Sequence, residues 1–74
     1  MTIDTQPSLA IRVNGEPRRV PGGISITGML NELSLDPQRV AVERNRQVVP
    51  RSSLADVKVE DGDEFEIVHF VGGG

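Results

Sequence analysis

Hydrophobic residues recur along the chain with two different periods. They occupy alternate positions in several short segments, which is typical of strands with one buried face. In one segment, 24–35, Ile26, Met29 and Leu30 instead follow helical spacing. The pattern predicts strands at 9–13 and 16–20, a helix within 24–35, strands at 39–45 and 47–49, one helical turn at 52–57, and a long strand at 64–71.

Turn-forming residues separate the predicted strands. Asn14-Gly15 is a strong hairpin signal, because both residues tolerate positive φ. Pro17 lacks an amide hydrogen, so the second strand should begin at an edge of the sheet or outside the ladder. Further turns are expected at Asn45-Arg46, where Asn tolerates left-handed backbone angles, and at 61–63.

The predicted helix has a start and an end signal. Ser25 or Thr27 can cap its first turn by accepting a hydrogen bond from a free N–H group. Gly28 weakens that turn, and Asp36-Pro37 is expected to end the element.

This order of elements predicts an α+β fold. Two hairpin halves flank one helix, so a mixed four- or five-stranded sheet should wrap around it on one face. That is the β-grasp layout of ubiquitin-like proteins. We expect three parts: a flexible polar leader at 1–8, a β-grasp domain at 9–71 and a flexible glycine tail at 72–74.

The last strand has different residues on its two faces. Side chains alternate along a strand, and unpaired carboxylates avoid the core. The face that carries the strand's two glutamates should therefore meet solvent, which places Phe65 and Ile67 in the core. Val68 and Phe70 then lie exposed just before the tail and form a candidate docking surface. The alternative is a bend or bulge that turns Phe70 inward.

Composition narrows the possible functions. The chain has 74 residues, no cysteine, one histidine and a formal net charge of −3. Its length predicts one domain, and the absence of cysteine excludes disulfides, thiolate metal sites and a cysteine nucleophile. The negative charge argues against nucleic-acid binding, and so does the scarcity of aromatic residues, which are two phenylalanines with no tryptophan or tyrosine. The chain shows neither a signal peptide nor an apolar run of membrane-spanning length, so we expect a cytoplasmic protein without a metal site.

The final residues Gly72–Gly74 cannot stabilise a fold, because glycine has no side chain and loses the most entropy on ordering. An inert, disordered end is the alternative. From Val71 onward the chain can extend roughly 13 Å, at about 3.3 Å per residue. A thin tail of this kind can carry the α-carboxylate of Gly74 into another protein's active site, so the tail has the character of a substrate.

Activation of that carboxylate needs a partner. Its attack on the α-phosphorus of ATP would give an acyl-adenylate, from which a sulfur nucleophile could displace AMP. The chain has no phosphate loop, no Ser/His/Asp set and no thiol, so no catalytic residue of its own is expected. The segment 21–27, PGGISIT, contains no lysine or arginine and is read as a turn rather than an anion site.

Three stretches resemble one known family. VNGEP near the start, VERNRQVVPR in the middle and EDGDEFEIVHFVGGG at the end are similar to the sulfur carriers of the thiamine pathway, the ThiS family. The resemblance covers Leu9 to Gly74. Ubiquitin and the small subunits of molybdopterin synthase share the diglycine end, so the internal stretches make the resemblance more specific.

The resemblance implies a β-grasp fold and a cycle of reactions. An adenylyltransferase of the ThiF type would use ATP and Mg²⁺ to adenylate Gly74. Sulfur from a cysteine desulfurase would convert the end to a thiocarboxylate, and a ThiG-type thiazole synthase would accept that sulfur. In this scheme Gly72 and Gly73 give clearance, while Val68, Phe70 and Val71 dock partners. The chain itself would be a monomer that binds no cofactor, nucleic acid or membrane.

Other functions stay open from the sequence. The same tail suits a carrier for molybdopterin or another sulfur metabolite, a ubiquitin-like modifier linked to lysines, or a binding module with an inert end. Arg44, Arg46 and Arg51 either contact an acidic partner or form a solvated strand rim, and the rim is favoured. His69 is read as a hydrogen-bonded or half-exposed histidine rather than a ligand or base.

Overall fold

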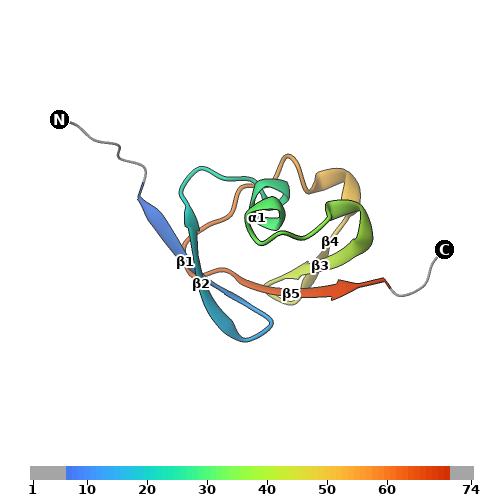
Figure 1. Cartoon of the computed structure of the whole chain (residues 1–74), viewed down its shortest axis with the longest axis horizontal. Coiled ribbons are helices and arrows are strands. Elements are labelled where there is room, and N and C mark those ends of the chain that lie inside the picture. Colours follow the sequence, from blue (N-terminus) through green and yellow to red (C-terminus); the bar gives the residue numbers. More distant parts are fainter. Residues whose placement is uncertain (1–6, 71–74) are drawn as a thin grey trace.

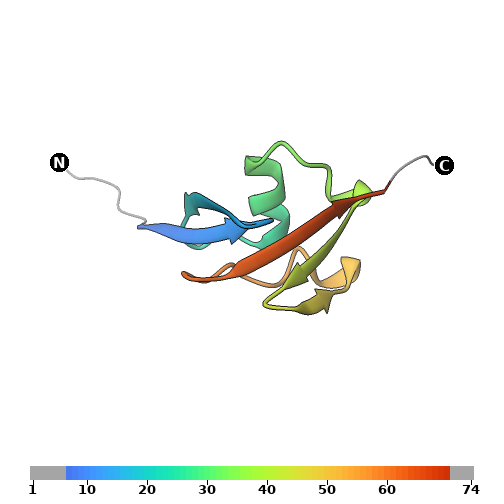
Figure 2. The ribbon, with the colours of Figure 1, turned by 90° about the horizontal axis from the view of Figure 1, so that it is seen from below.

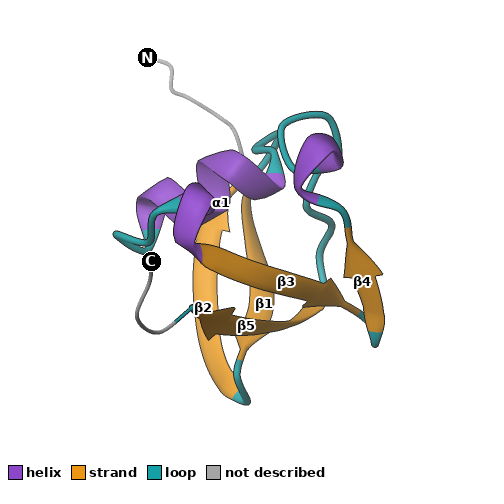
Figure 3. Cartoon of the chain, turned by 90° about the vertical axis from the view of Figure 1, so that its right-hand side faces the viewer, coloured by secondary structure: helices purple, strands orange, loops and turns teal. Residues whose placement is uncertain are grey.

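The computed structural model describes residues 7–70 as one mixed sheet with helical segments on one side (Figures 1 and 3). Its elements are β1 (Ser8–Val13), β2 (Glu16–Pro21), α1 (Ile26–Glu32), the 3₁₀ helix η1 (Pro37–Arg39), β3 (Val40–Arg44), β4 (Gln47–Val49), the 3₁₀ helix η2 (Arg51–Ser53) and β5 (Glu64–His69). The strand order is β2-β1-β5-β3-β4. This arrangement confirms the predicted α+β, β-grasp class.

Strand β5 lies at the centre of the sheet (Figure 2). It runs parallel to β1 and antiparallel to β3, and β1 and β3 each pair antiparallel with an outer strand. The outer strand β2 contains Pro17, which confirms the predicted edge position. The start of the last strand is therefore held from both sides, and its end pairs with β3.

Two tight hairpins set the register of the outer strands. Asn14 and Gly15 have φ of 51° and 84°, and Asn45 and Arg46 have φ of 50° and 73°. Positive φ at both central residues defines a type I′ turn, whose twist matches that of the flanking strands. Both predicted turns are confirmed. Strand β1 begins at Ser8, one residue before the predicted start.

Helix α1 starts as predicted but ends earlier. The Ser25 hydroxyl accepts a hydrogen bond from the Gly28 N–H at 3.1 Å, so Ser25 is the cap. The prediction that Asp36-Pro37 ends the helix was wrong, because α1 stops at Glu32. Ser34 has φ of 62° there, and its N–H donates to the Asn31 carbonyl while the Leu35 N–H donates to that of Leu30. This is a Schellman closure built on serine instead of glycine.

The core lies between α1 and the inner face of the sheet. Phe65 and Ile67 of β5 are only 1% and 6% exposed, which confirms the predicted orientation of this strand. The buried apolar residues are Ile11, Val13, Val20, Ile26, Met29, Leu30, Val40, Val42, Leu54, Val59, Phe65 and Ile67. They come from α1, four of the strands and the segment after η2, so the core joins the whole described domain.

Candidate functional site

The candidate site begins where β5 ends. Phe70 is the last residue that the structure describes, and it follows directly after the strand. The predicted reacting residue Gly74 lies outside the described residues, as do Val71, Gly72 and Gly73. The structure therefore defines the surface from which this segment departs.

The outer face of the sheet carries an apolar patch beside this end. We define the outer apolar patch as Ala41, Val48, Val68 and Phe70. The side chains of Val48, Val68 and Phe70 are 72%, 60% and 55% exposed, and Ala41 is also exposed. Ala41 lies opposite Val68 in the β3–β5 register, and Val48 belongs to the neighbouring strand β4. Three strands thus bring together residues that are far apart in the sequence.

Phe70 continues the alternation of β5. The pairing with β3 is regular from Phe65 to His69, and the Phe70 N–H donates to the Arg39 carbonyl at 2.9 Å. No bulge interrupts β5 in the described residues, so the ring is not turned into the core. The predicted exposure of Val68 and Phe70 is confirmed. Their role in docking stays a prediction.

Arg51 contacts the exposed ring. Its guanidinium carbon lies 5.4 Å from the centroid of the Phe70 ring, within the range of a cation–π contact. Its Nη2 also lies 3.4 Å from the Val40 carbonyl and donates to it. A shallow hollow of about 260 Å³ next to this pair is lined by Val48, Pro50 and Arg51 among others. Sequence reasoning missed the contact, because residues 51 and 70 are distant in the chain and no local pattern links them.

Arg44 has a different role from the solvated rim that was predicted. Its Nε donates to the Asp63 carboxylate at 2.9 Å, and Asp63 is only 5% exposed. The same carboxylate accepts from the Asn45 side chain at 3.1 Å and from the Glu60 N–H at 2.9 Å. The pair therefore ties the β3–β4 hairpin to the turn before β5. A hint was present in the sequence, since an aspartate after a turn glycine often binds local N–H groups.

Asn14 extends the contact between β1 and β5. Its amide donates to the Ile67 carbonyl at 3.1 Å and accepts from the Ile67 N–H at 2.8 Å. The backbones of β1 and β5 pair only over Arg12 and Val13. The side chain thus replaces the next rung of the ladder after β1 turns away, and it holds β5 close to its exposed end.

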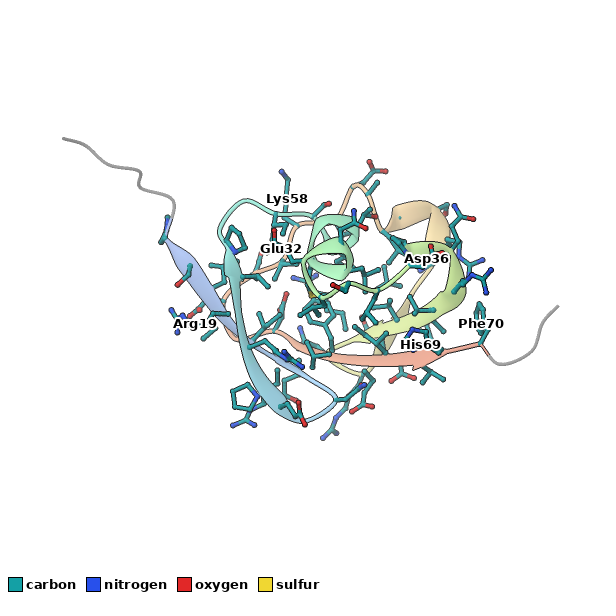
Figure 4. All side chains as sticks on the ribbon, viewed as in Figure 1. Arg19, Glu32, Asp36, Lys58, His69 and Phe70 are labelled. Carbon is teal, nitrogen blue, oxygen red and sulfur yellow. The ribbon has the colours of Figure 1, made fainter. Side chains whose placement is uncertain are left out.

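The remaining candidates carry no evident chemistry. His69 lies near the end of β5 (Figure 4) and is exposed. Within residues 7–70 its imidazole makes no hydrogen bond or ion pair. In the same part of the chain, no group of three or more His, Cys, Asp or Glu side chains is arranged to hold a metal ion. No helix among the described residues is long and apolar enough to cross a membrane.

Comparison with known proteins gives consistent similarities. A family model described as the ThiS family matches residues 11–74. The crystal structure of the thiamine biosynthesis protein ThiS from Geobacter metallireducens has a TM-score of 0.75 and 35% identity, covering 89% of this chain and all of that one. The sulfur carrier protein ThiS of Bacillus subtilis is 40% identical over 50 residues, which are 68% of this chain and 76% of that protein.

Longer proteins also match. A thiazole synthase of Paramagnetospirillum magneticum is 50% identical over 62 residues, and one of Magnetococcus marinus is 42% identical over 66 residues. These matches cover 84% and 89% of this chain, but only 19% and 20% of the two relatives. The chain thus spans about a fifth of the length of the thiazole synthases it resembles, and most of each of them has no counterpart here.

Proposed function

Because the chain belongs to the ThiS family, the sulfur carriers of thiamine biosynthesis, we propose that it carries sulfur as a thiocarboxylate on Gly74. The observation that carries this proposal is the family match, which extends through the glycines to residue 74. The exposed apolar patch beside the departure point of those residues supports it.

The proposed chemistry has two steps, both on a partner adenylyltransferase of the ThiF type. With ATP and Mg²⁺, an oxygen of the Gly74 carboxylate attacks the α-phosphorus, and pyrophosphate leaves. A sulfur nucleophile then attacks the acyl carbon, and AMP leaves. Hydrogen sulfide ion gives the thiocarboxylate directly. The persulfide of a cysteine desulfurase gives an acyl disulfide, which a thiol cleaves to the thiocarboxylate with formation of a new disulfide.

In this proposal the chain is a protein substrate and not a catalyst. The outer apolar patch docks on the partner, and burial of such side chains supplies affinity. Val71 extends the docking surface, and Gly72 and Gly73 allow entry into a narrow channel, because they have no Cβ atoms that would clash. Docking then aligns the C-terminal carboxylate with the reactants that the partner holds, so the reaction no longer depends on a chance bimolecular encounter.

A ThiG-type thiazole synthase is the proposed acceptor of the sulfur. Support comes from the two thiazole synthases that contain a segment similar to this chain. A carrier-like segment in the same chain as a thiazole synthase would act beside the active site of that enzyme. A carrier that is a separate protein would have to dock at that active site. The cycle, with the cysteine desulfurase as sulfur source, would run in the cytoplasm.

The test uses the absence of cysteine from the chain. The protein is incubated with its adenylyltransferase, ATP, Mg²⁺ and sulfide, and its intact mass is measured with and without a thiol-alkylating reagent. We expect exchange of one oxygen for sulfur, alkylation of the new sulfur, and localisation to Gly74 by peptide mapping. Omission of ATP and deletion of Gly73-Gly74 are the controls.

Several outcomes would contradict the proposal. An unchanged mass, while the same enzyme preparation modifies a known carrier, would favour an inert end. A mass shift on target proteins without thiocarboxylate would indicate a ubiquitin-like modifier. Failure to restore growth of a thiamine auxotroph that lacks its own carrier, despite thiocarboxylate formation, would point to another sulfur acceptor.

A further inference from the structure

Phe70 is held by contacts from three separate parts of the chain. Its covalent neighbour His69 belongs to β5, its N–H is bound by the Arg39 carbonyl at 2.9 Å, and its ring lies under the Arg51 guanidinium at 5.4 Å. Arg51 is itself tied to the start of β3 through the Val40 carbonyl. An exposed ring at the end of a strand thus has a fixed partner, even though it contributes nothing to the core.

We propose that Arg51 is a positioning residue, which stacks on Phe70 and so holds the ring in the orientation that aligns the carrier productively on the adenylyltransferase. The inference rests on the proposed function of Gly74. It adds a residue that does not react and that acts through another side chain. Phe70 belongs to the outer apolar patch, so an orientation imposed on its ring is passed to the proposed docking surface.

The geometry favours a positioning role of Arg51 over a role as an unspecific surface charge. A half-exposed aromatic side chain without a partner would exchange between rotamers, and this would reduce the fraction of docked complexes that are productively aligned. The planar guanidinium can cover the ring and donate to a carbonyl at the same time. Lysine could place a cation over the ring, but it lacks the planar, forked arrangement of donors.

The alternative is a direct contact between Arg51 and an acidic group of the partner. The two explanations differ in their dependence on Phe70. Positioning requires the ring, so loss of the ring should remove the effect of Arg51. A direct ion pair does not require the ring, so Arg51→Gln should then lower kcat/KM equally with phenylalanine or leucine at position 70.

The experiment is a double-mutant cycle on adenylation of the full chain. Arg51→Gln, Arg51→Lys, Phe70→Leu and the combined Arg51→Gln/Phe70→Leu protein are compared by steady-state kinetics with the carrier as varied substrate. We expect Arg51→Gln to lower kcat/KM about three- to fivefold, chiefly through kcat, as for an exposed cation–π contact. Arg51→Lys should restore part of the loss, and Arg51→Gln should have little further effect in the Phe70→Leu protein.

Arg18→Gln is the matched control. Arg18 lies on the edge strand β2, at the opposite edge of the sheet from β4, and within residues 7–70 its one ion pair is the exposed pair with Glu16 at 3.6 Å. Its substitution should leave kcat/KM at the wild-type value. In the free protein, NMR should show an upfield ring-current shift of the Arg51 side-chain protons, which Phe70→Leu abolishes.

The possible results separate the hypotheses. An equal loss from Arg51→Gln in both backgrounds, or a loss confined to KM, would overturn positioning in favour of direct contact. A lower unfolding midpoint with an unchanged kcat of the folded protein would mean a purely structural role. Wild-type activity of Arg51→Gln would refute the inference while leaving the proposed function intact, whereas no reaction of the wild type would refute the proposed function itself.

Discussion

At the scale of single residues, two aspartates in one turn have different environments. Asp61 and Asp63 flank Gly62, whose φ of 88° requires the left-handed region that favours glycine. Asp61 accepts from the Ala10 N–H at 2.8 Å and stays exposed, while Asp63 is buried and accepts three hydrogen bonds. Sequence alone could not separate them, because the burial of Asp63 depends on Arg44 arriving from another strand.

Substitution of Asp63 by Asn should destabilise the fold. The amide keeps the shape, but its NH₂ group faces a donor, and Arg44 loses its closer charged partner while keeping the exposed Glu60 at 3.9 Å. We expect a loss of about 2 kcal/mol in the free energy of unfolding. Urea denaturation measures it, with Asp56→Asn at an exposed position as control. Equal stability of the Asp63→Asn and wild-type proteins would show that the network contributes no net stability.

At the scale of elements, signals within a few residues were sufficient for the strands and hairpins. The alternation of apolar and polar residues predicted β1 and β5. Asn14-Gly15 predicted a turn whose geometry only a few residue types adopt. The end of α1 was not predictable in the same way. Its closure uses Ser34 at positive φ, and serine gives no such signal, so the sequence pattern indicates Asp36-Pro37 as the end instead.

Gly28 gives a test of packing against helix propensity. Alanine inside a helix is favoured over glycine by about 1 kcal/mol. However, a Cβ at Gly28 would lie 2.6 Å from Cγ1 of Ile24, which must then shift. Overpacking typically costs about 1–3 kcal/mol, so we expect Gly28→Ala to destabilise by about 1 kcal/mol in thermal unfolding followed by circular dichroism.

A control in the same helix isolates the propensity. Asn31 is exposed, so Asn31→Ala should stabilise α1 by about half a kcal/mol, because alanine has the higher helix propensity. Stabilisation by Gly28→Ala to the same extent would show that Ile24 moves freely and that the glycine is not needed for packing.

At the scale of the whole molecule, the two faces of the sheet have separate roles. The inner face holds the core against α1, and the outer face carries the outer apolar patch beside the end of β5. Alternation within one strand predicted Val68 and Phe70 on that face. Ala41 and Val48 could not be predicted, because only the pairing of β3 with β5 and β4 brings them there. The roles assigned to Val71 and Gly72–Gly74 stay predictions.

A charge within the outer apolar patch should weaken docking and leave the fold intact. Val68 is 60% exposed on the outer face of the sheet, so Val68→Lys should change the free energy of unfolding by less than about 0.5 kcal/mol. In a docked complex the ammonium would meet an apolar partner surface. We expect KM for the carrier in adenylation to rise about tenfold or more, as for loss of a central interface residue.

Ala10→Lys is the matched control for Val68→Lys. Ala10 is exposed on β1, where its neighbour Ile11 is buried, so it lies on the same outer face. The Ala10 N–H donates to Asp61 in the turn that precedes β5. Ala10 therefore lies near the start of β5, whereas Phe70 follows the end of that strand. Ala10→Lys should therefore retain the wild-type KM. If both substitutions raise KM equally, the whole outer face and not the outer apolar patch meets the partner. If neither does, the outer apolar patch is not the docking surface.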